Sequence, residues 1–431
     1  MLDNALKSTV DRAWDGVWSS GVTNPIVVSD LLGSLLMVSG IDGAASWKAL
    51  AVAARTSNST AIAGHFAQVR GAHGIDAGSE IESEGFWRDS RVLVRAMDAM
   101  EPVARASGDV LGDIYEHILS KLSLAGHFGQ FRTPRHIVEL MVQLVDPQDG
   151  EKVLDPACGS GGFLVEASSY RHLRGRVGTF EGVEIDRTVA RLAAANTVLH
   201  SMGDGVIGQG DGLRLSTTPA DVILANPPFA GSVGSDVAAT FASGATKTEL
   251  LFVEAIGRAL VDRGRAAVIV PTSVLVGANA SAKWIRKSLV LENNLISVTE
   301  LPSGVFRPYT DVKTAILFWR AEPPSGTTLM LRVVNDGLSL DQRRVPIGDN
   351  DLPDVLAAHR GEPVSIPTAH VTSAELAATG FNLSPSRYLA STPVAPDIDV
   401  STVGVGESIE LLRVSVERMN RSLREMEELA R

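Results

Sequence analysis

Residues 221–229 read DVILANPPF, a short apolar run that ends in an amide, two prolines and an aromatic ring. Asn226 offers a side-chain carbonyl acceptor, and Pro227 and Pro228 hold φ at about −65° and lack backbone donors, so that an exposed backbone carbonyl can also accept. Phe229 adds a flat apolar face. Two acceptors and a ring suit a planar group that bears an amino nitrogen, because the acceptors hold the N–H bonds and leave the lone pair free to attack an electrophile. The alternative is an ordinary turn with a core phenylalanine.

A glycine-rich stretch, DPACGSGGF at residues 155–163, ends an earlier apolar run. Asp155 places a carboxylate at the end of that expected strand. Gly159 and the two glycines after Ser160 let the chain turn tightly into a helix and approach a ligand closely. No lysine follows the first glycines, so the stretch is not a phosphate-binding P-loop. By itself it also fits a tight turn without a ligand.

Acidic residues also end the next two expected strands. Glu184 in GVEID is placed to accept hydrogen bonds from ribose hydroxyls, and Asp211 in GQGDGL is placed to accept one from an adenine amino group. One such acid alone often caps a strand or a turn. Three in succession at one sheet edge predict a ligand that carries a nucleoside and needs no phosphate.

The elements that position these residues follow from the pattern of the chain. Seven short β-rich runs alternate with helical stretches, which predicts an α/β fold: a doubly wound, Rossmann-like, seven-stranded and mostly parallel sheet with ligands at the carboxyl ends of its strands. The runs are EKVLDPAC, TFEGVEI, GVIGQGD, DVILANP, RAAVIVP, LISVTELP and KTAILFW.

We expect four regions along the chain. They are an N-terminal helical domain (1–125), a catalytic domain (126–321), a small C-terminal appendage (322–398) with proline-rich joints around a possible strand TLMLRVV, and a C-terminal helix (399–431). Helical spacing in SDLLGSLLMV and DVLGDIYEHILSKL supports the first of them.

The last region has a regular apolar pattern. Its apolar residues recur at alternating spacings of three and four, which predicts a coiled-coil seam for a partner helix. A helix folded back on its own catalytic domain is the alternative. The seam residues are Ile409, Leu412, Val416, Met419, Leu423, Met426 and Ala430.

The composition of the chain disfavours several classes of protein. The 431-residue chain has a net charge of −11, a single cysteine, Cys158, and no Cys or His cluster with metal-ligand spacing, so we expect neither a disulfide framework nor a structural metal. No long apolar run or leader segment is evident, which favours a cytoplasmic protein without a membrane. The acidic charge disfavours an unaided grip on nucleic acid, although residues 251–320 carry nine basic against five acidic side chains.

The order DPACGSGGF, GVEID, GQGD and NPPF resembles the motifs of amino-directed, S-adenosylmethionine-dependent DNA methyltransferases. Flanking segments are similar to the modification (HsdM-type) subunit of type I restriction-modification systems, an adenine-N6 DNA methyltransferase. They are GDIYEHILSKL, GHFGQFRTPRHIVELMVQLVDP, LPSGVFRPYTDVKTAILFW and FNLSPSRYL. The resemblance covers roughly residues 110–390.

This resemblance implies S-adenosyl-L-methionine as the cofactor. Its ribose would be held by Glu184 and its adenine by Asp211, in agreement with the interpretation of these residues above. Thr133 and Pro134 of the FRTPR segment would line the methionine end. The further residues implied along this ligand are Asp155, Ala157 and Gly159.

The resemblance also implies that Asn226, Pro227 and Phe229 hold the target adenine. That base must rotate out of the duplex, because its amino nitrogen cannot otherwise meet the sulfonium methyl in line. Pro228 and Phe306 are further candidates for contact with the base, and a core or loop role fits Phe306 equally. Arg132 stands where the family often has tyrosine, which leaves that position without an assigned contact.

The implied partners are double-stranded DNA, a specificity subunit bound through the C-terminal helix, with two modification subunits per specificity subunit, and a separate restriction subunit. The expected location is the cytoplasm, in association with the nucleoid. Two alternatives stay open: a methyltransferase for protein glutamine or ribosomal RNA, and a catalytically silent S-adenosylmethionine-binding scaffold.

Overall fold

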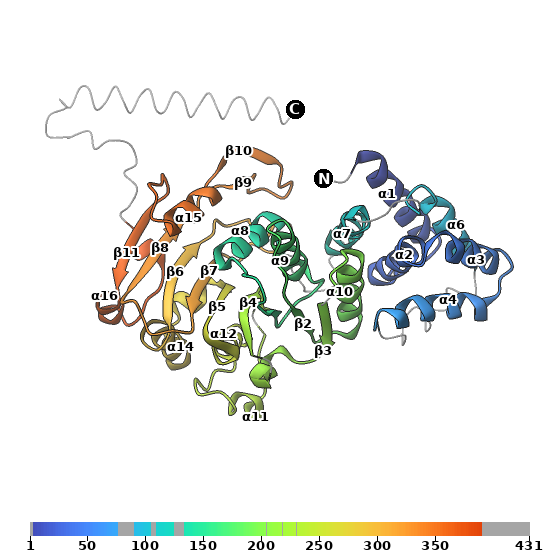
Figure 1. Ribbon diagram of the computed structural model, residues 1–431. Helices are drawn as coiled ribbons and strands as arrows, with labels where there is room; N and C mark the ends of the chain where they lie inside the picture. Colours follow the sequence, from blue (N-terminus) through green and yellow to red (C-terminus); the bar gives the residue numbers. More distant parts are fainter. Residues whose placement is uncertain are drawn as a thin grey trace, which may run out of the picture. The chain divides into compact units, whose positions relative to one another are not determined.

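The computed structural model of this chain describes residues 3–75, 90–104, 109–124, 133–203, 205–217, 219–229 and 231–389. These residues form a group of N-terminal helices and an α/β region built on one large sheet (Figure 1). The predicted α/β class with an N-terminal helical part is confirmed. The C-terminal helix predicted over 399–431 lies outside the described residues.

A nine-stranded mixed sheet has the order β11-β8-β6-β7-β5-β4-β1-β2-β3. From β3 through β2, β1 and β4 to β5 the strands run parallel, whereas β7 is antiparallel to both β5 and β6. The strands are β1 (Val153–Asp155), β2 (Phe180–Glu184), β3 (Gly205–Gln209), β4 (Ala220–Ala225), β5 (Leu260–Pro271), β6 (Asn294–Glu300), β7 (Thr314–Arg320), β8 (Thr327–Arg332) and β11 (Thr368–Thr372).

The predicted count of seven strands is wrong. β8 pairs parallel with β6, and β11 pairs antiparallel with β8, so the segment after β7 extends the same sheet. β8 coincides with the run TLMLRVV. β11 is hard to recognise in the sequence, because a short edge strand whose side chains are mostly exposed lacks the apolar pattern of a core strand. A separate hairpin consists of β9 (Asp336–Leu338) and β10 (Pro346–Asn350).

Helices cover both faces of the sheet (Figure 1). On one face lie α8 (Arg135–Val145), α9 (Gly162–His172), α10 (Arg187–Leu199) and α15 (Leu352–His359), and their apolar side chains share a core with the strands. The other face carries α12 (Thr248–Ala259) and α14 (Ala280–Leu291). Short helices complete the region: η2 (Gly212–Thr217), α11 (Ser235–Ala238), α13 (Thr272–Val276), α16 (Ser373–Ala378) and η3 (Pro385–Arg387).

The N-terminal helices pack around α2 (Pro25–Gly40), which is buried from Pro25 to Ser39. The Asn24 side chain caps its first turn by accepting a hydrogen bond from the Ile26 amide at 3.0 Å. A helix that is apolar on all sides must be surrounded. Its neighbours include α1 (Asn4–Trp18), α3 (Gly43–Arg55), α4 (Ser59–Ala72), α6 (Ser90–Met100) and α7 (Asp109–Leu124). Within the described ranges, no helix is long and apolar enough to cross a bilayer.

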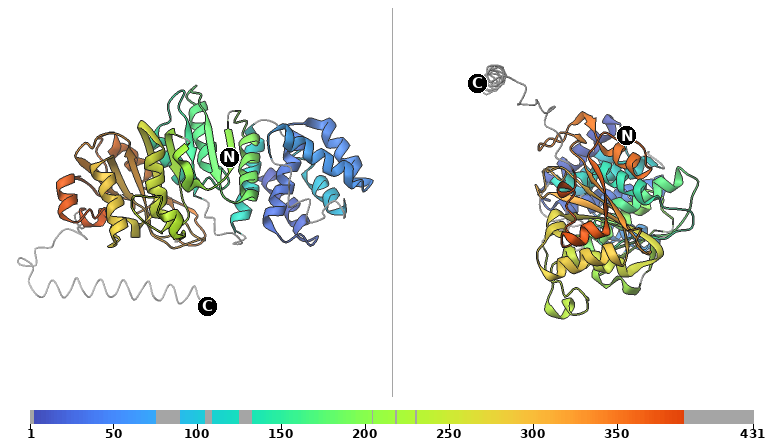
Figure 2. Two further views of the ribbon diagram at one scale, coloured as in Figure 1. Left: turned by 90° about the horizontal axis from the view of Figure 1, so that it is seen from below. Right: turned by 90° about the vertical axis from the view of Figure 1, so that its left-hand side faces the viewer.

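The two regions share α10 (Figure 2). Leu192, Ala195 and Leu199 of α10 belong to the apolar core of the N-terminal helices. The Tyr115 hydroxyl of α7 donates to the Leu192 carbonyl at 3.3 Å. α10 therefore lies against the sheet and also completes the helical core.

Polar contacts between distant segments fix α8, the helix that precedes β1. Arg265 of β5 donates to the Asp146 carbonyl at 2.7 Å and to both carboxylate oxygens of Glu151 at 2.8 Å. On α8 itself, His136 Nε2 lies 2.9 Å from Asp336 Oδ2 of β9. Both ends of α8 are thus tied to the sheet region.

Replacement of Gly33 tests the packing of α2 against α7. A Cβ at Gly33 would lie 2.4 Å from Tyr115 Cε2, so Gly33→Ala forces the ring away from the Leu192 carbonyl. Overpacking of this kind costs about 1–3 kcal/mol, and we expect a lower thermal unfolding midpoint. Gly64→Ala in α4 is the matched control, because its Cβ meets nothing within 4 Å. Equal midpoints for the two variants would contradict this packing.

Candidate active site

Four polar side chains meet at one edge because their strands are parallel. Asp155 ends β1, Glu184 ends β2 and Asn226 directly follows β4, while Asp211 comes two residues after β3. In the register, Asp155 lies opposite Gly182. The strand-end residues predicted from the sequence therefore lie along a single edge of the sheet.

Asp155 is a buried carboxyl group with little to stabilise its charge. It is 1% exposed, and its Oδ1 accepts one hydrogen bond, from the Ala157 amide at 3.1 Å. Burial is the main cause that raises the pKa of Asp155 to about 8; the bond from Ala157 opposes this rise, and the nearby charge of Glu184 adds to it. A ligand that brings positive charge to this position would favour the ionised carboxylate.

Glu184 holds the glycine loop. Its Oε2 accepts from the Gly159 amide at 3.1 Å, and its Oε1 accepts from the Asp186 amide at 2.9 Å. Gly159 and Gly161 have φ values of 52° and 83°, a region that favours glycine. Burial raises the pKa of Glu184, although the bonds from Asp186 and Gly159 oppose the rise. The carboxylate thus lies between the loop after β1 and the start of α10.

A buried amide links the same loop to the N-terminal helices. Asn196 of α10 donates to the Ser160 carbonyl at 2.9 Å and to Glu116 Oε1 of α7 at 2.8 Å. The sequence offers no signal for this contact, because the three residues belong to separate segments.

Asp211 is partly exposed at the end of the row. Its Oδ1 accepts from the Leu213 amide at 3.0 Å, and its Oδ2 lies 3.6 Å from Arg214 Nε. Ile185, directly after Glu184, is 69% exposed, which is unusual for a large apolar side chain beside buried groups. Sequence reasoning missed Ile185. The signal that could have found it is an apolar residue directly after the acid that ends a strand.

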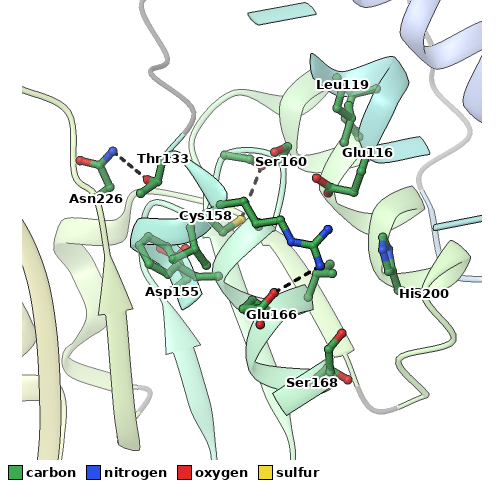
Figure 3. A pocket seen from close by; sticks show the side chains of 18 of the residues that line it. Glu116, Leu119, Thr133, Asp155, Cys158, Ser160, Glu166, Ser168, His200 and Asn226 are labelled. Atoms are coloured by element: carbon green, nitrogen blue, oxygen red, sulfur yellow. Dashed lines mark hydrogen bonds and ion pairs between the residues drawn. The ribbon is translucent and has the colours of Figure 1, made fainter. Parts of the chain in front are cut away.

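Asn226 is oriented by a residue far away in the chain. Its Nδ2 donates to Thr133 Oγ1 at 3.0 Å (Figure 3). Thr133 directly precedes Pro134, the residue before α8. Its Oδ1 is inaccessible and has no hydrogen-bond partner among the described residues. An unpaired buried acceptor costs free energy unless a partner reaches it.

The backbone after Asn226 is held rigidly. The Thr248 hydroxyl at the start of α12 donates to the Pro228 carbonyl at 3.2 Å, and the Thr248 amide donates to the Gly231 carbonyl at 3.1 Å. A side chain at Gly231 would collide with Thr248. Pro227 is buried and Pro228 is exposed. Thr248 is a further residue that sequence reasoning missed.

Phe306 supports Phe229 in this structure. Phe306 is 1% exposed, and its ring meets the ring of Phe229 edge to face, with centroids 6.5 Å apart. Phe229 is only partly buried. Of the two roles that the sequence left open for Phe306, the structure favours the core role.

A cavity of about 450 Å³ collects part of the predicted set. Thr133, Asp155, Ala157, Gly159 and Asn226 line it, as Figure 3 shows for three of them. Its far wall comes from α7, through Asp113 and Glu116 among others. Glu184, Asp211 and Phe229 are not part of its lining. Among the described residues, no group of His, Cys, Asp or Glu could hold a metal ion.

Comparison with known proteins identifies the family. Residues 106–396 match the family described as N-6 DNA Methylase. The chain belongs to this family. The matched range includes the whole sheet and every site residue considered above.

Individual relatives are consistent with this assignment. The chain is 36% identical over 253 residues to the type I restriction enzyme EcoEI methylase subunit of Escherichia coli, which covers 54% of this chain and 51% of that protein. A structure of a modification subunit of a putative type I restriction enzyme from Vibrio vulnificus is 29% identical, with a TM-score of 0.60 over 66% of this chain and 65% of that one. The chain thus aligns with about half the length of the EcoEI subunit.

Likeness of fold extends further than likeness of sequence. A chain from a structure titled for complex assembly and conformational transition of the type I R-M system is 24% identical, with a TM-score of 0.70 over 99% of this chain and 98% of that chain. This likeness concerns the fold alone.

Replacement of Asp155 tests its protonation. Because the folded-state pKa is raised to about 8, the native carboxyl keeps its proton where the unfolded chain releases it, so its contribution to stability is lost as pH rises from about 4 to 8. Asp155→Asn keeps the acceptor for Ala157 but does not titrate. We expect its unfolding free energy, relative to wild type, to rise across that window by on the order of a few kcal/mol, and to level off above pH 8. A difference independent of pH in denaturant titrations would contradict the assignment.

Proposed function

We propose that this chain is the modification subunit of a type I restriction-modification system, and that it methylates the exocyclic amino group of adenine in double-stranded DNA. The observation that carries the proposal is the unpartnered Oδ1 of Asn226, in the same cavity as the buried carboxyl group of Asp155. Family membership and the methylase subunits among its relatives support it. Such a subunit would act in the cytoplasm, at the nucleoid.

The residues present fit S-adenosylmethionine. Among the described residues, only the bond from the Ala157 amide favours the ionised form of Asp155, and this ligand carries an ammonium and a sulfonium group. Thr133, Pro134, Ala157 and Gly159 would complete the methionine end. Glu184 would hold the ribose and Asp211 the adenine. When bound, the cofactor supplies a methyl group on a positively charged sulfur.

The target adenine would be held by the group that follows β4. Asn226 Oδ1 and the Pro227 carbonyl would accept the two amino hydrogens, and Phe229 would stack on the ring. With its N–H bonds held in this way, the amino nitrogen would present its lone pair to a methyl donor, and one amino proton would have to leave for water. The bond to Thr248 keeps the Pro228 segment in place during this step.

Other methyltransferase classes are less well supported. NPPF alone also fits an enzyme for protein glutamine or ribosomal RNA, or a silent scaffold. The family match favours DNA, because it begins before α7 and includes the FRTPR segment as well as the motifs shared by all of these classes. Deletion of the acceptor at Asn226 also distinguishes an active enzyme from a scaffold.

Assembly is the second part of the proposal. Two modification subunits would bind one specificity subunit, which would read the DNA sequence, and a restriction subunit would be a separate chain. The contact would be the predicted seam between Ile409 and Ala430, which lies outside the described residues. The acidic charge of the chain agrees with delegated DNA recognition.

Asn226→Ala tests the chemistry. It removes an acceptor whose bond tightens as the nitrogen becomes pyramidal, so kcat on target DNA should fall by about two powers of ten or more. S-adenosylmethionine affinity, measured by calorimetry, should stay nearly unchanged. Asp211→Ala is the matched control with the opposite pattern, a loss of about 1–3 kcal/mol in cofactor binding. A comparable loss of cofactor affinity in Asn226→Ala would contradict the assignment of Asn226 to the target base.

Removal of residues 405–431 tests the partner helix. We expect intact S-adenosylmethionine binding but no stable complex with the specificity subunit on size exclusion, and no site-specific methylation. Leu412→Asp in the seam should mimic the truncation, whereas Arg421→Asp on another face of the helix should assemble normally. Undiminished co-elution of the truncated chain would disprove this contact.

A further inference from the structure

The hydrogen bond between Asn226 and Thr133 joins side chains 93 residues apart. Asn226 Nδ2 is the donor and Thr133 Oγ1 is the acceptor, at 3.0 Å. Both residues line the 450 Å³ cavity, together with Asp155 (Figure 3). The bond therefore lies where the reacting groups of the proposed methyl transfer would meet.

The direction of this bond matters for chemistry. A side-chain amide can rotate by half a turn, which exchanges its acceptor oxygen with its donor nitrogen. With Nδ2 bound to Thr133, the Asn226 oxygen is left without a partner among the described residues. In the reverse orientation an NH₂ group would take its place, and it would oppose a substrate amino group, because both would be donors.

We propose that Thr133 is a positioning residue that holds the Asn226 amide with its oxygen available to the target amino group. This inference rests on the proposed function and adds a role for Thr133 beyond lining the cofactor. A hydroxyl that gives its own hydrogen to another acceptor in the cavity can only accept from Asn226. The bound cofactor has a carboxylate of that kind, so its binding would favour the productive orientation.

The position of Thr133 is set by the helix that follows it. Pro134 caps α8, and its carbonyl accepts from the Ile137 amide at 2.9 Å. Ile137 and Met141 are fully buried in the core shared with the sheet. Since β4 belongs to that sheet, one rigid core fixes the positions of Thr133 and Asn226 relative to each other. Their positions do not depend on a surface loop.

Three substitutions test the inference, each measured in the complex with the specificity subunit on DNA that carries the target adenine. Thr133→Val and Thr133→Ala remove the acceptor, and we expect both to lower kcat by about 10- to 100-fold. Thr133→Ser keeps a hydroxyl and should recover most of kcat relative to valine. Because the Thr133 hydroxyl would also donate to the cofactor carboxylate, valine and alanine should raise the Kd for S-adenosylhomocysteine, but by less than the fall in kcat, and serine should keep that Kd within about threefold of wild type.

Two further readouts separate orientation from a general defect. Capture of 2-aminopurine at the target position should persist in Thr133→Val, because this base lacks the 6-amino group that the Asn226 oxygen would accept. In the Asn226→Ala background, Thr133→Val should cause no additional loss, since no amide remains to orient. A disturbed fold would lower 2-aminopurine capture and multiply the two losses.

Each outcome of these measurements either supports or overturns the positioning role of Thr133. The positioning role is overturned if Thr133→Val keeps wild-type kcat, if its loss multiplies with that of Asn226→Ala, or if S-adenosylhomocysteine binding weakens as much as kcat. It is supported if kcat falls by more than S-adenosylhomocysteine affinity, serine recovers kcat and the double variant equals Asn226→Ala. Full activity of Asn226→Ala would instead overturn the proposed function itself.

Discussion

Parallel pairing of β1 with β2 on one side and β4 on the other is the constraint on which the candidate site depends. β1 has three residues, all buried, and it brings the ends of the neighbouring strands to one edge. A shift of one residue would turn Asp155 to the opposite face of the sheet, because side chains alternate along a strand. The helices packed on both faces oppose such a shift, since it would disrupt the fit of the side chains between strand and helix.

Burial disfavours charge both at that edge and elsewhere in the sheet region. Arg286 of α14 is buried too, yet it donates to the carbonyls of Phe381, Val274 and Gly277 at 2.6 to 2.9 Å. A charge satisfied in this way stabilises the packing of α14. Burial lowers the pKa of Arg286 and raises those of Asp155 and Glu184 at the candidate site, so in all three groups it disfavours the charged form. The stability of the surrounding core offsets these costs.

The N-terminal helices are part of this arrangement. α10 contributes both to their core and to the layer over the sheet, so the helical part and the sheet are not independent. Asn196 connects α7 to the loop that follows β1 through Glu116 and the Ser160 carbonyl. One wall of the cavity therefore depends on α7, a helix that does not pack directly on the sheet as a crossover.

The amino-acid sequence by itself determined the class of the fold and the row of strand-end residues. Buried parallel strands are apolar runs that end in glycine or polar residues, and their common direction brings Asp155, Glu184 and Asn226 to the same edge. Local patterns of this kind depend on residues close together in the chain.

Only the tertiary structure decided the rest. The extension of the sheet by β8 and β11, the burial of Phe306 against Phe229, and the bond from Asn226 to Thr133 all join distant segments. No periodicity records such contacts, because they arise when separate elements pack on one core. The direction in which the Asn226 amide points is of this kind, since the sequence supplies the amide but its partner comes from the start of another helix.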